Sequence, residues 1–166
     1  MQHAGANDKS TTACKIDHIA IAVDDLEMAI SWYCEGLGLA VRERRTTQGK
    51  LTSMVSAVLE GAGIPIVLLQ GCEPNSQVSR FVEKRGPGVQ HVAFSVPNLD
   101  SGIARLQNVD CEPAIPLIEG DGIRQVFLEH DGRSGPRIEL VEHSGGTFND
   151  GSVEQLFIAF ESLNLY

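Results

Sequence analysis

Two histidines occupy equivalent places in an internal repeat. Residues 16–30, IDHIAIAVDDLEMAI, align with residues 89–103, VQHVAFSVPNLDSGI, with identity at five of 15 positions. The alignment pairs His18 with His91, 73 residues further along the chain. Each lies in an apolar run typical of a buried strand, where an unpartnered polar group costs roughly 2–7 kcal/mol. A metal ion shared between two inward-facing imidazoles explains both burials together.

A carboxylate in the last strand of the second repeat provides a third candidate ligand. Aligning residues 65–71, PIVLLQG, with residues 137–143, RIELVEH, pairs Val67 with Glu139. A carboxylate inside a buried strand favours a nearby cation, whereas valine cannot coordinate one. The sequence therefore predicts a metal held by His18, His91 and Glu139 with coordination positions left open. Two histidines and one carboxylate are typical of non-haem Fe(II) oxygenases.

The other histidines carry less information. His3 belongs to the N-terminal tail, and His130 and His143 lie in or beside expected turns. We expect solvent-exposed roles for all three.

The elements that must position these ligands form two similar units, each with the order strand, helix and three strands. The first is expected to have a strand ending at Val23, a helix over 26–38, and strands at 39–45, 51–59 and 64–70. The second is expected to have a strand ending at Val96, a helix over 98–107, and strands around 112–118, 124–130 and 137–143. A pseudo-two-fold axis relating the units would bring His18 and His91 to one cleft. The fold class is therefore α+β, with two pseudo-symmetric βαβββ modules.

The boundaries follow from this repeat. Module 1 spans about 15–73, a connecting helix about 76–86, module 2 about 88–144 and a C-terminal helix about 152–164. We expect a disordered tail over 1–14 and a single domain over 15–166. Apolar residues at helical spacing in the last helix (Val153, Leu156, Phe157, Phe160, Leu163) indicate a face that docks on the core or on a second subunit, so a homodimer is compatible with the sequence.

Composition excludes several classes of function. The 166 residues are 42% hydrophobic and 21% charged, with a net charge of −9, which argues against nucleic acid or an anionic membrane as the main partner. No apolar run approaches the roughly 18 residues needed to span a bilayer. The N-terminal residues lack the apolar core of a signal peptide, and the four cysteines form no CxxC pair, so we expect a reduced, cytoplasmic protein.

The segments IDHIAIAVDDLEMAISWYCEGLGL, GPGVQHVAFSV and RIELVEH together resemble the vicinal oxygen chelate superfamily of glyoxalases, bleomycin resistance proteins and dioxygenases. The resemblance covers roughly residues 16–143. It implies that the paired modules form a cupped mixed sheet around a divalent metal. Fe(II) is the first choice, with Co(II), Mn(II) and Zn(II) as alternatives.

From residue 51 onward the chain resembles the catalytic half of 4-hydroxyphenylpyruvate dioxygenase and hydroxymandelate synthase. That resemblance implies that Gln125 positions the substrate, that Phe127 forms one wall of an aromatic clamp, and that Phe148 matches a family phenylalanine. The second clamp phenylalanine falls on Val153, which disfavours phenylpyruvates. The implied activity is a dioxygenase that couples oxidation by O2 to decarboxylation of a 2-oxo acid.

Two other functions remain open. The short length and the segment SQVSRFVEKRGPGVQH also resemble methylmalonyl-CoA epimerase, which would act on an acyl-CoA. That family has a fourth ligand where this chain has Val67, and a glutamate base near Gln48, whose amide cannot abstract a proton. A non-catalytic module that sequesters a small molecule is the third class, although the His-His-Glu set weighs against it.

Overall fold

The computed structural model describes residues 14–129 and 135–165. The expected tail over 1–14, apart from Cys14, and the residues around His130 lie outside this range. In chain order the elements are β1 (Lys15–Ala22), α1 (Leu26–Ser31), η1 (Trp32–Gly36), β2 (Ala40–Gln48), β3 (Ser53–Glu60), β4 (Ile66–Gly71), α2 (Gln77–Arg85), β5 (Gly88–Ser95), α3 (Leu99–Gln107), β6 (Ile118–Gly120), β7 (Ile123–Phe127), β8 (Arg137–His143) and α4 (Asp150–Leu163). None of the described helices is long and apolar enough to cross a membrane.

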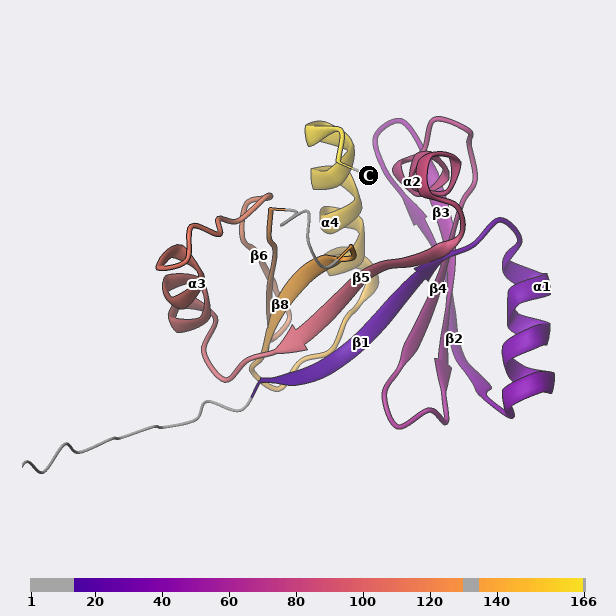
Figure 1. Cartoon of the computed structure of the whole chain (residues 1–166), viewed down its shortest axis with the longest axis horizontal. Coiled ribbons are helices and arrows are strands. Elements are labelled where there is room, and N and C mark those ends of the chain that lie inside the picture. The colour runs from indigo at the N-terminus through magenta and orange to yellow at the C-terminus, as the bar shows by residue number, and fades with distance from the viewer. Residues whose placement is uncertain (1–13, 130–134, 166) are drawn as a thin grey trace, which may run out of the picture.

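The described strands form one eight-stranded sheet in the order β2-β3-β4-β1-β5-β8-β7-β6. Each half repeats the same topology, with β1 parallel to β4 and β5 parallel to β8. The halves join where β1 and β5 pair antiparallel. The sheet curls around a concave face, and α1 and α3 lie at the two far ends of the molecule (Figure 1). The prediction of two βαβββ modules in an α+β fold is confirmed.

Side chains along each strand alternate between the sheet face that packs against α1 or α3 and the concave face. In module 1, Leu59 and Leu68 pack under α1 residues Leu26 and Ile30. In module 2, Val126 and Leu140 pack with Leu99 of α3. Side chains of the opposite parity face the concave side, where they can meet ligands.

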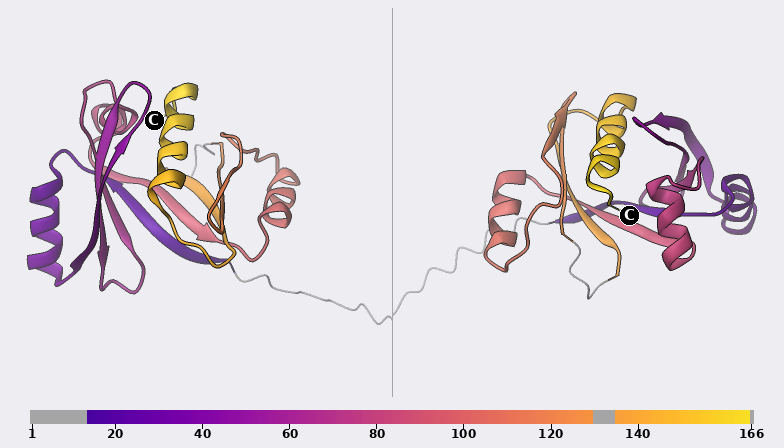
Figure 2. Two further views of the ribbon diagram at one scale, coloured as in Figure 1. Left: turned by 180° about the vertical axis from the view of Figure 1, so that it is seen from behind. Right: turned by 90° about the horizontal axis from the view of Figure 1, so that it is seen from above.

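Helix α4 closes the concave side between the halves (Figure 2). It begins with a capping box between Asn149 and Ser152, so it starts before the expected residue 152. At its other end the Glu161 carboxylate accepts backbone N–H groups of Lys50 at 2.7 Å and Thr52 at 2.8 Å. A Cβ on Gly49 would lie 2.5 Å from a Glu161 oxygen, so a larger residue would displace this carboxylate. The C-terminal helix is thereby fastened to module 1.

Two expected elements differ from the structure. The expected strand at 112–118 is wrong: β6 covers only Ile118–Gly120, and Pro113 makes an isolated bridge to Leu128. Pro113 and Pro116 lack the N–H that a strand ladder needs. The expected single helix over 26–38 consists of α1 followed by the π-helical segment η1, and Gly38 leaves it with a φ of 74°.

Candidate metal centre

The two histidines meet across the seam between β1 and β5. Ala93 pairs with His18, and Ala20 pairs with His91. Both alanines are fully buried, and their small side chains leave room for the rings on the concave face. The Nε2 atoms of His18 and His91 are 3.2 Å apart.

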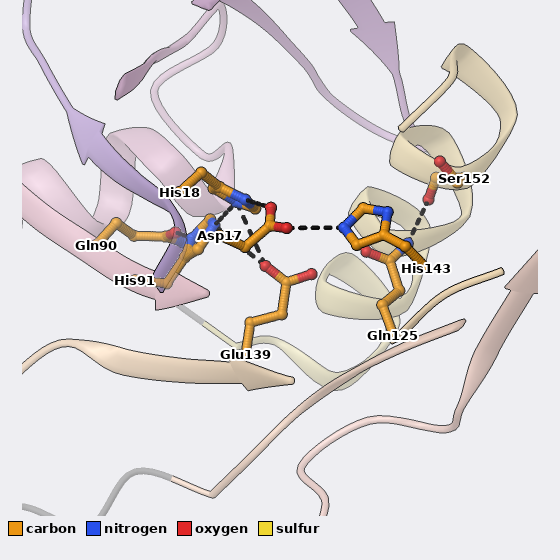
Figure 3. A network of polar contacts seen from close by, with 8 residues as sticks. All are labelled: Asp17, His18, Gln90, His91, Gln125, Glu139, His143 and Ser152. Atoms are coloured by element: carbon orange, nitrogen blue, oxygen red, sulfur yellow. Dashed lines mark hydrogen bonds and ion pairs between the residues drawn. The ribbon is translucent and has the colours of Figure 1, made fainter. Parts of the chain in front are cut away.

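Glu139 reaches the same point from β8. It pairs with Ala93, as Val67 on β4 pairs with Ala20, so the strand register reproduces the equivalence of Glu139 and Val67. Its Oε2 atom lies 3.5 Å from Nε2 of His18 and 3.6 Å from Nε2 of His91 (Figure 3). One donor atom from each of the three side chains lies within 4.8 Å of the others. The structure therefore brings together the three residues that the sequence singled out.

A β-bulge precedes each histidine. The register of β1 against β5 shifts between Ile16 and His18, which leaves Asp17 as the extra residue of β1. It shifts again opposite Gln90, the extra residue of β5. A bulge re-aims the side chain of the extra residue, which strict alternation would place on the other face of the sheet. Asp17 and Gln90 consequently line the concave side beside the histidine that each precedes.

These two residues orient the rings. The Nδ1–H of His18 donates to Asp17 Oδ1 at 2.8 Å, and the Nδ1–H of His91 donates to Gln90 Oε1. With the proton of each neutral ring held on Nδ1, the lone pair of Nε2 points toward the other ring. Two such lone pairs cannot satisfy each other, but both can coordinate a cation.

The donor set fits a divalent metal. The Glu139 side chain is 1% exposed, and neither of its oxygens has a hydrogen-bond partner among the described residues. For metal–ligand bonds of about 2.1 Å, adjacent ligands lie about 3.0–3.4 Å apart, which is close to the observed spacings. A cation would balance a buried carboxylate that otherwise lacks compensation.

Burial of the three ligands also shifts their pKa values. Burial raises the pKa of Glu139 to about 7. Burial, with a contribution from the charge of His18, holds the pKa of His91 well below its usual range. Burial also lowers the pKa of His18, but the hydrogen bond to Asp17 and the charge of Glu139 outweigh it, so this pKa is raised. A metal would favour the ionised carboxylate and neutral imidazoles.

A cavity of about 440 Å³ opens from the three ligands. Val67 lines it beside the ligands, where its aliphatic side chain cannot coordinate. Phe127 and Phe148 line it too, with ring centroids 4.9 Å from His91 and 5.2 Å from His18 respectively. Val153 of α4 contributes an aliphatic surface. Val67, Phe127, Phe148 and Val153 therefore all face this cavity.

Gln125 is placed differently. It shares the concave face with Phe127, as alternation predicts, but it is fully buried and is not one of the described residues that line the cavity. Its amide donates to the Ser152 carbonyl at the start of α4, at 3.3 Å (Figure 3). Its Oε1 has no hydrogen-bond partner among the described residues. Gln125 therefore does not line the cavity in this structure, and its expected role in substrate positioning stays a prediction.

Several polar residues of the cavity were missed by the sequence analysis. Gln77 at the start of α2 lines the cavity and donates to the Phe157 carbonyl at 3.2 Å. Glu43 and Arg45 of β2 also line it and form an ion pair with each other. His143 is solvent-exposed, as expected, but it also lines the cavity. The charged run VRERR in β2 is typical of an exposed strand, so the sequence did not indicate that some of its side chains face the cavity.

Comparisons with known proteins agree with this architecture. Residues 17–127 match the Glyoxalase/Bleomycin resistance protein/Dioxygenase superfamily. An uncharacterized protein of Bacillus subtilis, YqjC, is 28% identical over 138 residues, which cover 82% of this chain and 97% of that protein. The chain belongs to this superfamily, whose members bind divalent metals and small-molecule substrates.

Two solved structures represent different branches. Methylmalonyl-CoA epimerase from Mycobacterium tuberculosis is 32% identical, with a TM-score of 0.64 over 77% of this chain and 87% of that chain. A variant of 4-hydroxymandelate synthase from Streptomyces coelicolor is 17% identical, with a TM-score of 0.76 over 91% of this chain and 54% of that chain. The second similarity concerns the fold, and this chain spans about half of that enzyme.

Proposed function

We propose that this protein is a non-haem Fe(II)-dependent dioxygenase that acts on a 2-oxo acid. The observation that carries the proposal is the pairing of a His18–His91–Glu139 set with an aliphatic Val67 at the symmetry-equivalent strand position. Three protein ligands leave coordination positions for substrate, as the facial arrangement of such oxygenases requires. Bound Fe(II) would supply a Lewis acid for the oxo acid and electrons for O2.

The residues of this chain would bind and shield the substrate. Asp17 and Gln90 hold the histidine rings in one orientation. Phe127, Phe148 and α4 would exclude water from the ligand-bearing end of the cavity. Neither histidine needs to act as a base, because both Nε2 atoms face the metal position. With Val153 in place of a second aromatic wall, we expect an aliphatic 2-oxo acid to fit better than 4-hydroxyphenylpyruvate.

The test is O2 uptake by anaerobically purified protein loaded with Fe(II), measured against a panel of 2-oxo acids. A fourth ligand from Val67→Gln should lower uptake by about 10-fold or more while metal content is kept, because fewer positions stay open. Val67→Leu is the matched control and should behave like the wild type. Failure of every 2-oxo acid to promote O2 uptake would contradict the dioxygenase proposal.

A metal-dependent acyl-CoA epimerase is the second candidate, favoured by the 32% identity to the mycobacterial enzyme. Glu43 adds a cavity-lining carboxylate that could act as a base. Against it, the Gln48 amide cannot act as a base and donates to the Thr52 carbonyl. Gln70, the nearest amide to Val67 on β4, accepts the backbone N–H of Leu26 and supplies no fourth ligand. Exchange of the α-proton of an acyl-CoA in deuterated water, lost in Glu43→Gln, would favour the epimerase.

A further inference from the structure

Asp17 joins two imidazoles that come from opposite halves of the molecule. Its Oδ1 accepts the Nδ1–H of His18, and its Oδ2 accepts the Nε2–H of His143 at 2.7 Å (Figure 3). The Nδ1 of His143 lies 3.1 Å from the Gly146 carbonyl, which can only accept. The His143 ring therefore lies between the Asp17 carboxylate and the Gly146 carbonyl, with one ring nitrogen within hydrogen-bond distance of each.

This arrangement limits the freedom of the Asp17 carboxylate. A carboxylate with one bonded oxygen can rotate about its last torsion, whereas one with both oxygens bonded is held in a plane. The Asp17 side chain is 18% exposed, so water competes weakly for its oxygens.

The corresponding position in the other module has a simpler partner. Gln90, the equivalent of Asp17, orients His91 through a neutral amide oxygen. His143 belongs to the end of β8, four residues after Glu139 on the same strand. The strand that carries the carboxylate ligand thus also carries a residue that reaches the orienting group of His18.

We propose that His143 is a positioning residue of the metal centre, acting on His18 through Asp17. The proposal rests on the metal site of the proposed function but holds for either reaction at that site. Outer hydrogen-bond partners of metal-ligating histidines typically contribute 10–100-fold in metal affinity. Since His143 acts one residue further out than Asp17, we expect its contribution near the lower end of that range.

The test is a double-mutant cycle read out by binding of Co²⁺ to the metal-free protein, followed by visible absorption. His143→Leu should weaken Co²⁺ binding about 10-fold and alter the absorption bands, because the His18 ring is no longer held. His143→Gln retains an N–H donor and should recover most of the affinity. In an Asp17→Ala background, His143→Leu should cause no further loss, because the group through which it acts is gone.

The outcomes separate this inference from the metal site itself. Unchanged or tighter Co²⁺ binding by His143→Leu would overturn the positioning role while leaving the site intact. An equal loss from His143→Leu with and without Asp17 would also overturn it, since the effect would then be independent or a general loss of folding. Both proposals would be overturned if the wild type does not bind Co²⁺, or if His18→Ala binds Co²⁺ as tightly as the wild type does.

Discussion

The two modules present the same backbone and different side chains at the centre. Each provides a histidine opposite an alanine and a bulged residue before that histidine. Module 1 carries Asp17 at the bulge and Val67 on the parallel strand, whereas module 2 carries Gln90 and Glu139. The repeated fold therefore offers two positions for a carboxylate ligand and fills only one. Ligand number depends here on single side chains rather than on a change of architecture.

The orienting groups show the opposite distribution of charge. The charged acceptor serves His18 in the module that lacks a carboxylate ligand, and the neutral acceptor serves His91 in the module that has one. A carboxylate acceptor makes an imidazole more basic than an amide does. Each half therefore contributes one anion to the centre. Glu139 would bind the metal directly, whereas Asp17 acts on it through its hydrogen bond to His18.

Removing the carboxylate ligand should have the largest effect. Glu139→Ala leaves two histidines and no anionic donor, so we expect loss of stoichiometric metal binding. Metal analysis after gel filtration measures it. Retention of one metal per chain in this variant would show that Glu139 is not a ligand.

Moving the carboxylate to the equivalent strand should recover part of that loss. Val67→Glu placed in Glu139→Val puts the anionic donor on β4, at the same register relative to the histidine pair. We expect tighter Co²⁺ binding than in Glu139→Val alone, by about 10-fold, because the backbone positions are equivalent. Titration of both variants under identical conditions decides it. Equal binding would mean that the two halves differ in more than side chains.

The metal-free protein should reveal the buried carboxylate through its pH dependence. Burial raises the pKa of Glu139 from 4.5 to about 7. The folded state therefore holds this proton longer than the unfolded state, and its stabilising effect, complete below pH 4.5, is lost as pH rises toward 7. At about 1.4 kcal/mol per pKa unit, the loss is about 3.5 kcal/mol at most.

Glu139→Gln cannot titrate at this position and provides the comparison for that experiment. Between pH 4.5 and 7, the free energy of unfolding of the metal-free wild type should fall relative to that of Glu139→Gln. Urea titrations of both proteins measure this difference. Parallel pH profiles for the two proteins would contradict the raised pKa.

The smallest expected effect compares the two orienting residues. Asp17→Leu and Gln90→Leu each remove one acceptor, but only the first also removes a charge. Both should weaken Co²⁺ binding within the 10–100-fold range, with Asp17→Leu several-fold weaker than Gln90→Leu. A larger loss from Gln90→Leu would reverse the assignment of the stronger orienting group.

The sequence predicts the backbone of this centre better than its surroundings. The repeat alone pairs Val67 with Glu139, and the strand register reproduces that pairing. The bulges at Asp17 and Gln90 could not be predicted, because they insert single residues without interrupting the apolar pattern. Contacts of His143 and Gln125 depend on how the chain after β8 folds back over the sheet, which no local pattern encodes.

The β1–β5 seam has a consequence for how the protein resists unfolding. The ligands come from both sides of this single strand pairing, so a bound ion would tie the two halves together as a cross-link does. Ions that bind only the folded state add RT ln(1 + [L]/Kd) to its stability, about 2.7 kcal/mol at a hundredfold excess over Kd. Amide protons along β1 and β5 should then exchange more slowly in the metal-loaded protein than in the metal-free protein.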